Sequence, residues 1–218
     1  DLRTGRSTNV QVWPETPVGK SPRDLKYRWV WSYPLVASRH APGTLYVGSQ
    51  FVHKTTDGGS TWREISPDLT TDDETKQVDS GGLTLDNVGV DYGTTLFAIG
   101  ESPLEPDVLW VGSNDGLIHV TRDGGDSWTN VTVNLDSLPP WGTVSNIEAS
   151  RFAVGSAYVT VDLHQVDDRN PYVYRTNDFG ASWTLITNGI PRGMLSYAHV
   201  IREDPERPGM LYLGTENA

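Results

Sequence analysis

The sequence contains no cysteine, so disulfide bridges, thiolate zinc sites and a cysteine nucleophile are excluded. No apolar run approaches the roughly 20 residues of a membrane-spanning helix, and no span is expected in this segment. Basic residues are outnumbered: 17 Lys and Arg stand against 28 Asp and Glu, giving a net charge of −11. Because such a surface repels phosphate backbones, nucleic acid is not an expected partner.

Helical periodicity is hard to find along the chain, and motifs for phosphate loops, zinc sites or Ser-His-Asp triads do not occur. We therefore expect no cofactor and no metal. The chain does contain 22 Gly and 14 Pro, with eight Trp and nine Tyr against four Phe. This composition is typical of a soluble, turn-rich protein whose aromatic residues lie in sheets and at binding surfaces.

One motif occurs three times and follows the pattern T-x-D-x-G-x-[ST]-W. Asp in a tight turn accepts hydrogen bonds from nearby backbone N–H groups, Gly allows a positive φ, and Trp opens the next strand. We therefore interpret the pattern residues as structural, each set forming a hairpin turn, rather than as calcium or ligand sites. They are Thr55, Asp57, Gly59 and Trp62; Thr121, Asp123, Gly125 and Trp128; and Thr176, Asp178, Gly180 and Trp183.

Short apolar runs recur upstream of the motifs at 45–48, 109–112 and 157–160, and again at 211–214. Four strands around each motif make the unit of a β-propeller blade. The predicted fold is all-β, a propeller of four-stranded antiparallel blades, with residues 1–218 forming part of one ring. The expected blades are 26–67, 94–133, 144–188 and a truncated 197–218, with 1–20 as the tail of a preceding blade and 10–13 as its outer strand.

The first strand of the 26–67 blade is expected near 29–37, and the acidic stretch 68–91 is interpreted as a solvated loop rather than a calcium loop. From the register of the other blades, a fourth motif would fall beyond Ala218. A partial ring exposes strand edges, which natural proteins avoid. We therefore expect the remaining blades of the same protein to complete it.

The repeated motif resembles the Asp box, or BNR repeat, of sialidases, sortilin-type receptors and xyloglucan-degrading propellers. The segments 110–116, 120–125, 140–148 and 212–217 resemble large bacterial sortilin-like repeat proteins more closely. Those proteins are often labelled glycosyl hydrolases, and the resemblance implies a secreted or periplasmic bacterial protein. Asp boxes lie away from the catalytic face of such propellers, so they report the fold and not the chemistry.

Candidate ligand-binding residues follow from the topology. Strands in a blade alternate in direction, so the turns between second and third strands lie at the end opposite the motifs. Together with the loops between blades, these turns carry carboxylates, an amide, a His and a Trp, which suit a sugar or peptide ligand. The predicted set is Asn114, Asp115, Trp141, Asp162, His164 and Glu216.

We expect recognition of a glycan or protein ligand by an extracytoplasmic module. One alternative is a glycoside hydrolase, sialidase-like or xyloglucanase-like, that uses two of the carboxylates Asp115, Glu148, Asp162 and Glu216. The arginine triad and Tyr–Glu pair of sialidases cannot be assigned on this stretch. A second alternative is a structural subunit of a larger assembly, whose faces dock other proteins.

Overall fold

The computed structural model describes residues 3–78, 93–136 and 138–217, and these residues form an all-β protein. Three sheets contain four antiparallel strands each and a fourth contains two. We refer to these sheets as blades 1 to 4. Their strands are β1 (Leu35–Ala37), β2 (Leu45–Gly48), β3 (Val52–Thr55) and β4 (Arg63–Glu64); β5 (Leu96–Glu101), β6 (Leu109–Ser113), β7 (Ile118–Thr121) and β8 (Thr129–Asn130); β9 (Thr143–Ala149), β10 (Ala157–Asp162), β11 (Tyr172–Thr176) and β12 (Thr184–Leu185); and β13 (Ala198–Glu203) and β14 (Leu211–Thr215).

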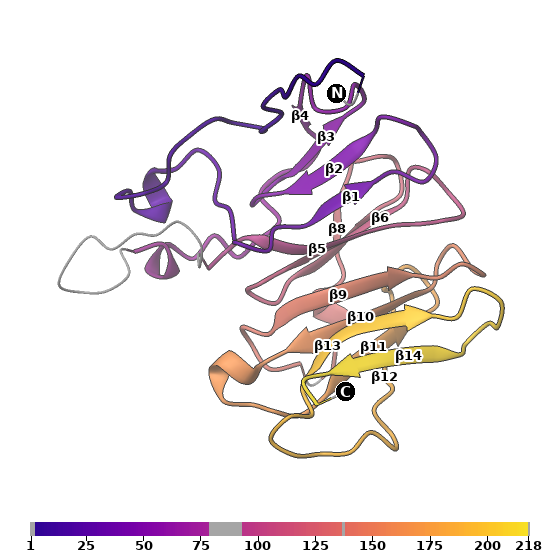
Figure 1. Ribbon diagram of the computed structural model, residues 1–218. Coiled ribbons are helices and arrows are strands. Elements are labelled where there is room, and N and C mark those ends of the chain that lie inside the picture. The colour runs from indigo at the N-terminus through magenta and orange to yellow at the C-terminus, as the bar shows by residue number, and fades with distance from the viewer. Residues whose placement is uncertain (1–2, 79–92, 137, 218) are drawn as a thin grey trace.

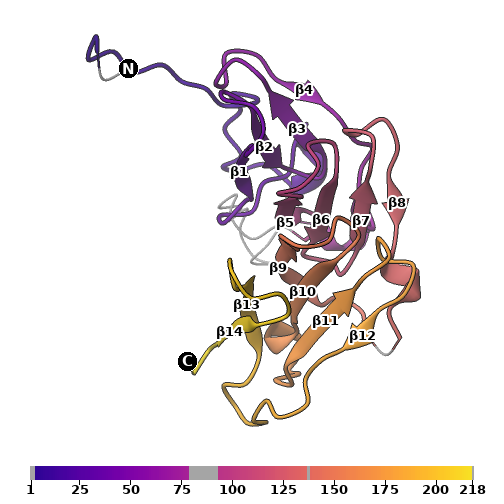
Figure 2. The same cartoon turned by 90° about the vertical axis from the view of Figure 1, so that its right-hand side faces the viewer.

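Each blade is a meander in which neighbours in sequence are neighbours in the sheet. The blades follow one another from the indigo N-terminal part to the yellow C-terminal part (Figure 1). Seen from the side, β1, β5, β9 and β13 lie along one edge of the stack, and β4, β8 and β12 lie along the other (Figure 2). This is the arrangement of propeller blades around an axis, and the predicted fold class is confirmed for a partial set of blades.

Turns alternate between the two ends of the blades. At one end, the motif turns meet the turns between first and second strands: the N–H of Gly58 donates to Gly43 O at 3.0 Å, and that of Phe179 to Gly155 O at 2.9 Å. We call this the motif end. The opposite end carries the turns between second and third strands and the connections between blades, which include the short 3₁₀ helices η1 (Pro22–Asp24), η2 (Glu74–Lys76), η3 (Thr132–Asn134) and η4 (His164–Val166).

The three motif turns share one hydrogen-bond pattern. In the first, Asp57 Oδ1 accepts from the Thr55 hydroxyl at 2.7 Å and from the Thr61 N–H at 2.9 Å, while Thr55 Oγ1 accepts from the Gly59 N–H at 2.9 Å. The second and third turns repeat these bonds through Asp123 and Asp178. All of these partners lie within four residues, so each turn is a local structure.

The motif tryptophans connect neighbouring blades. The indole N–H of Trp128 donates to Ile65 O at 2.8 Å, and that of Trp183 donates to Val131 O at 3.2 Å. Ile65 and Val131 each follow the outer strand of the preceding blade. Trp62 makes the same bond to Val10 O at 2.9 Å. Residue 10 therefore takes the position expected for the end of a preceding blade, although no strand forms at 10–13.

Close packing between blades is set by small residues on the second strands. A Cβ atom on Gly112 of β6 would lie 2.2 Å from a Val144 methyl group of β9, so this position accepts only hydrogen. In blade 3 the equivalent residue is the larger Thr160, and the residue equivalent to Val144 in blade 4 is the smaller Ala198. A larger residue on one side of the interface is thus matched by a smaller residue on the other side, as close-packed cores require.

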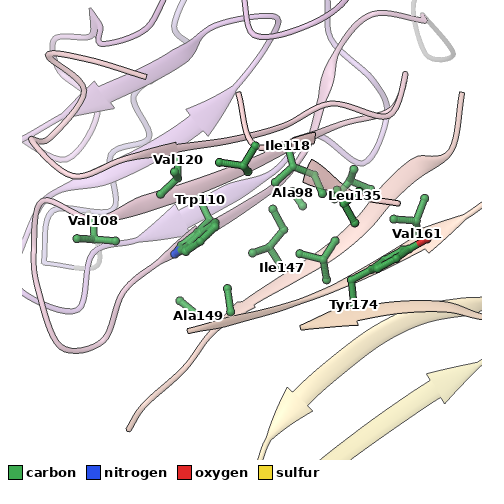
Figure 3. Close-up of a cluster of buried hydrophobic side chains, with 14 of the residues drawn as sticks. Ala98, Val108, Trp110, Ile118, Val120, Leu135, Ile147, Ala149, Val161 and Tyr174 are labelled. Atoms are coloured by element: carbon green, nitrogen blue, oxygen red, sulfur yellow. The ribbon is translucent and has the colours of Figure 1, made fainter. Parts of the chain in front are cut away.

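The core between blades 2 and 3 contains Trp110, which is fully buried, beside Ala149 (Figure 3). The equivalent place between blades 3 and 4 holds a polar contact beside apolar residues: the hydroxyl of Tyr158 donates to Glu203 at 3.0 Å, and that of Ser150 donates to it at 2.7 Å. A Tyr–Glu pair and a Trp–Ala pair therefore fill the same kind of space in two different ways.

The start of blade 1 differs from the sequence expectation. The first strand of blade 1 begins at Leu35 and not near residue 29. The outer strands β4, β8 and β12 contain two residues each. Of the acidic stretch, residues 79–91 lie outside the described residues, while 74–76 form η2.

Candidate functional site

The turn between β6 and β7 holds the predicted residues Asn114 and Asp115. Asn114 Oδ1 accepts the Thr95 N–H at 2.9 Å. Asp115 is 4% exposed, and its Oδ2 accepts both the N–H and the hydroxyl of Thr71 at 2.7 Å. Its Oδ1 accepts the Ser113 hydroxyl. The Asp115 side chain, a predicted ligand residue, is therefore buried, and its carboxylate ties the connection between blades 1 and 2 to blade 2.

Trp141 lies in the connection between blades 2 and 3 and has a positive φ of 66°. The Lys76 ammonium stands 5.0 Å from its ring centroid, a cation–π contact with the connection that precedes blade 2. The Trp141 ring is therefore engaged with the loop around η2.

Asp162 and His164 are in direct contact. Asp162 is the last residue of β10, and its side chain is 9% exposed. The His164 backbone N–H donates to Asp162 Oδ1 at 2.9 Å, and His164 Nδ1 lies 2.8 Å from both carboxylate oxygens. This bidentate contact fixes the ring orientation and leaves the Nε2 edge of the imidazole pointing away from its carboxylate.

Blade 4 adds three residues to this pair. Tyr197 precedes β13, and its ring stacks on His164 with centroids 4.7 Å apart. His199, on β13, meets the Tyr197 ring edge to face at 5.1 Å. Its Nε2 lies 2.9 Å from Glu216 Oε2, and its Nδ1 lies 3.7 Å from Asp162 Oδ2. We call Asp162, His164, Tyr197, His199 and Glu216 the histidine cluster.

The histidine cluster has one buried side and one accessible polar side. Tyr197 is buried, whereas the side chains of His164, His199 and Glu216 are 36%, 40% and 45% exposed. The hydrogen bond from His199 lowers the pKa of Glu216, so this carboxylate is ionised at neutral pH. Burial, followed by the charges of Glu216 and Asp162, raises the pKa of Tyr197 and keeps its hydroxyl protonated.

Glu148 does not join the other predicted carboxylates. Asp162 pairs with Thr143 at one end of β9, and Glu148 stands five positions further along that strand, toward the motif end. At roughly 3.3 Å per residue, the two positions are about 16 Å apart. Because glycosidase carboxylates are about 5 to 9.5 Å apart, Asp162 and Glu148 do not have the spacing of a catalytic pair.

The motif carboxylates also lie away from the cluster, at the motif end. Hydrogen bonds from Thr61 and Thr55 lower the pKa of Asp57 to about 2, and bonds from Ser127 and Thr121 do the same for Asp123. Bonds from Ser182 and Thr176 lower the pKa of Asp178. Across the described ranges, no group of three or more His, Cys, Asp or Glu residues is arranged to hold a metal ion.

The histidine cluster thus brings together three of the six predicted ligand residues, Asp162, His164 and Glu216. Sequence reasoning missed Tyr197 and His199. Their spacing of two places both on one face of the strand entering blade 4, which is the signal that could have identified them. Their partner His164 is more than thirty positions earlier, and only the fold brings the three rings into contact.

Comparison with known proteins shows the fold alone. No protein-family model matches the chain, and no curated protein matches it. A GH74 xyloglucanase from Xanthomonas campestris superposes with a TM-score of 0.57 at 17% identity, covering 90% of this chain and 27% of the enzyme. A GH74 enzyme from Niastella koreensis gives 0.51 at 13% identity, covering 87% and 27%. YCF48 from Cyanidioschyzon merolae gives 0.51 at 15% identity, covering 90% and 58%.

The chain therefore spans about a quarter of the two GH74 structures and somewhat more than half of YCF48. These similarities support a β-propeller module. Among the described residues, the structure contains no helix with the length and apolar character needed to cross a membrane.

Proposed function

We propose that this chain belongs to an extracytoplasmic recognition module and binds an extracellular glycan or polypeptide at the histidine cluster. The observation that carries the proposal is that two adjacent blades present two imidazoles and a carboxylate, all partly exposed, around a buried tyrosine. Such groups can donate and accept hydrogen bonds with sugar hydroxyls or peptide groups. They lie on loops and strand ends of a rigid sheet, where binding residues are commonly found.

The contacts made by the four candidate carboxylates favour recognition over catalysis. Both oxygens of Asp115 are bonded within a buried connection, and both oxygens of Asp162 contact one histidine ring. Glu148 lies toward the opposite end of its strand. A carboxylate acting as general acid or nucleophile needs free access to the scissile bond, and only Glu216 of the four combines exposure with a place in the cluster.

A glycoside hydrolase is the second candidate, and one observation favours it. The His199 ring contacts both Asp162 and Glu216, so these two carboxylates are separated by about the width of one imidazole and its contacts. That separation is compatible with paired carboxylates. Two of the similar structures are GH74 enzymes, one of them a xyloglucanase. A hydrolase built on this chain would use Asp162 and Glu216.

We also propose a relationship to bacterial sortilin-like repeat proteins and a secreted or periplasmic location. The resemblance of the repeated motif to the Asp box supports both. The hydrogen bonds of the three motif turns are in keeping with it, since every pattern residue serves the turn or the contact between blades. The remaining blades of a longer protein would be the structural partner, and docking of other proteins is the third possibility to be tested.

The experiment is a binding screen of the intact protein on arrays of polysaccharides and peptides, with release of reducing sugar measured in parallel. We expect one class of ligand to bind without being cleaved. Glu216→Gln and His199→Gln should each weaken binding by about tenfold, the loss of one charge-assisted hydrogen bond. Glu206→Gln, at an exposed position in the turn between β13 and β14, is the matched control and should bind normally.

Sugar release that disappears in Glu216→Gln would show a hydrolase and overturn recognition as the function. Binding that is unchanged in both cluster variants would place the ligand elsewhere. Co-purification of a stoichiometric protein whose docking is unaffected by these substitutions would favour the structural subunit.

A further inference from the structure

A cavity of about 180 Å³ lies between the first strands of the blades, near the motif end. Its lining comes from β1, β5, β9 and β13 and from the turns that follow β1, β5 and β9. Three guanidinium groups border it, from Arg39, Arg151 and Arg202, together with the carboxylate of Glu148. Because the histidine cluster lies at the opposite end of the same strands, this is a separate site.

The charges around the cavity are incompletely paired. Arg202 Nη1 donates to Asn146 Oδ1 at 2.6 Å and to Ile201 O at 2.7 Å, but it lies 3.6 Å from Glu148 Oε2. Arg151 Nε lies 4.0 Å from Glu148 Oε1, so both ion pairs with Glu148 are beyond hydrogen-bond distance. The Nε atom of Arg151 is buried and has no hydrogen-bond partner among the described residues. A buried donor without a partner is destabilising, so this N–H beside the cavity would gain from an acceptor on a bound ligand.

The neighbouring carboxylates do not supply that acceptor. Glu101 is held by the Ser38 hydroxyl at 2.7 Å and by the Arg39 N–H at 2.6 Å. Glu203 is held by hydroxyl groups, as described for the interface of blades 3 and 4. Burial raises the pKa of Glu148 although the three arginines act to lower it, so the guanidinium groups only partly offset the desolvation of this carboxylate.

The other residues around the cavity, together with its volume, determine which kind of anion fits. Val36, Ile99 and Pro103 give one side of the cavity an apolar surface. The volume is below the few hundred Å³ of a site that encloses a drug-sized ligand, so it suits the end of a ligand. Guanidinium groups match the planar geometry of a carboxylate, which they bind through paired N–H donors.

We propose that this arginine cavity binds a carboxylate carried on a short aliphatic stem, with Arg39, Arg151 and Arg202 as donors and Glu148 as a competing internal anion. The apolar lining receives the stem, and the Arg151 Nε–H gains the acceptor that it lacks. In a chain of net charge −11, this gathering of cationic groups is a local exception that would attract an anion to the cavity.

The test uses the intact chain and glutarate as the probe, titrated at constant ionic strength with sodium chloride. Binding is followed through the Nε–Hε resonances of the arginine side chains in ¹⁵N-edited NMR spectra. We expect saturable shifts at Arg151 and Arg202, and an affinity about tenfold weaker in Arg202→Gln. Arg39→Gln, at an exposed turn position that tolerates substitution, should weaken binding as well. Arg63→Gln, on the outer strand β4, is the control and should leave it unchanged.

The direction in which Glu148→Gln changes the affinity for glutarate tests the role of Glu148 directly. If Glu148 competes with the ligand, removing its charge strengthens glutarate binding, whereas a purely structural ion cluster would show no gain. Shifts that stay linear in glutarate, or that persist unchanged in Arg39→Gln and Arg202→Gln, would refute the site. Saturation by phosphate or sulfate without saturation by glutarate would refute the carboxylate specificity.

Discussion

Gly125 lies at a contact between two blades that one added carbon atom would disrupt. It has a φ of +106°, and a Cβ atom there would lie 2.5 Å from Ile65 O and 2.9 Å from Ile65 Cβ. The same carbonyl accepts the indole N–H of Trp128 at 2.8 Å. Gly125→Ala therefore forces the backbone of blade 1 away from the hydrogen bond that holds it to blade 2.

The expected loss of stability has three contributions. A left-handed backbone costs an L-residue about 1 to 2 kcal/mol. Overpacking against a fixed backbone adds about 1 to 3 kcal/mol, and the weakened indole hydrogen bond about 1 kcal/mol. Gly125→Ala should thus destabilise by about 3 to 6 kcal/mol.

Gly124→Ala is the matched control in the same turn. Its φ is +71°, and the nearest atom to an added Cβ is the movable Asp107 Oδ1 at 3.0 Å. The third motif already places Phe179 at this position, with a φ of 57°. We therefore expect Gly124→Ala to cost only about 1 to 2 kcal/mol, the penalty of the backbone conformation.

Urea unfolding of both variants, followed by circular dichroism, measures the difference. A double-mutant cycle with Trp128→Phe tests its origin: since Gly125→Ala and loss of the indole N–H act on one carbonyl, their effects should be less than additive. Equal stability of the two alanine variants, within about 0.5 kcal/mol, would refute the reasoning.

Three further predictions concern buried polar groups and packing. Burial lowers the pKa of His53 and of His119 to about 4, so the folded state resists protonation: stability should fall as pH drops from about 6.5 to about 4, by at most about 3 kcal/mol per histidine, as measured by denaturation at each pH. Asp115→Asn should destabilise by about 1 to 3 kcal/mol in the same assay without changing ligand binding, and a stable variant with altered ligand binding would contradict its structural role. Ala149→Glu should destabilise by overpacking, and adding Trp110→Tyr should recover about 0.5 to 3 kcal/mol of coupling by recreating a Tyr–Glu pair; no recovery would contradict the exchange inferred between interfaces.

Local structure was predictable because its causes are local. Every hydrogen bond around Asp57 connects residues at most four positions apart, so the turn could be predicted from the motif. Alternation of strand direction then assigned the motifs and the turn of Asp115 to opposite ends of β7. The fold class and the separation of the two ends follow from these two regularities.

The start of blade 1 was mispredicted because a strand-like pattern serves another purpose. Tyr27, Trp29 and Tyr33 alternate with other residues as they would in a strand. Their rings instead form an edge-to-face aromatic group at the end of blade 1 opposite its motif turn. The ring centroids of Tyr27 and His53 are 4.6 Å apart, and those of Trp29 and Tyr33 are 5.4 Å apart. The paired register begins at Leu35, next to Pro34, whose carbonyl accepts from the Gly48 N–H at 3.1 Å but which has no N–H to donate.

Contacts between blades could not be predicted from the repeat, because equivalent positions hold different residues that fit only as pairs. Asp115 meets Thr71, 44 positions away, and neither residue type indicates that the bond exists. Tyr158 requires Glu203, while Trp110 at the equivalent place requires Ala149. A repeat shows which positions correspond, and complementarity across an interface then decides which residues can occupy them.

Turn length explains why the histidine cluster forms between blades 3 and 4. His164 lies in a turn of nine residues between β10 and β11, long enough to form η4 and project a ring toward blade 4. The turn between β6 and β7 is shorter, and Asp115 folds inward to Thr71 and Ser113 instead. Both turns thus hold a buried carboxylate, Asp115 in one and Asp162 in the other, but only the longer turn adds a partly exposed imidazole. The length of the turn, together with the residue that meets it from a neighbouring connection or blade, determines whether the turn presents an accessible side chain.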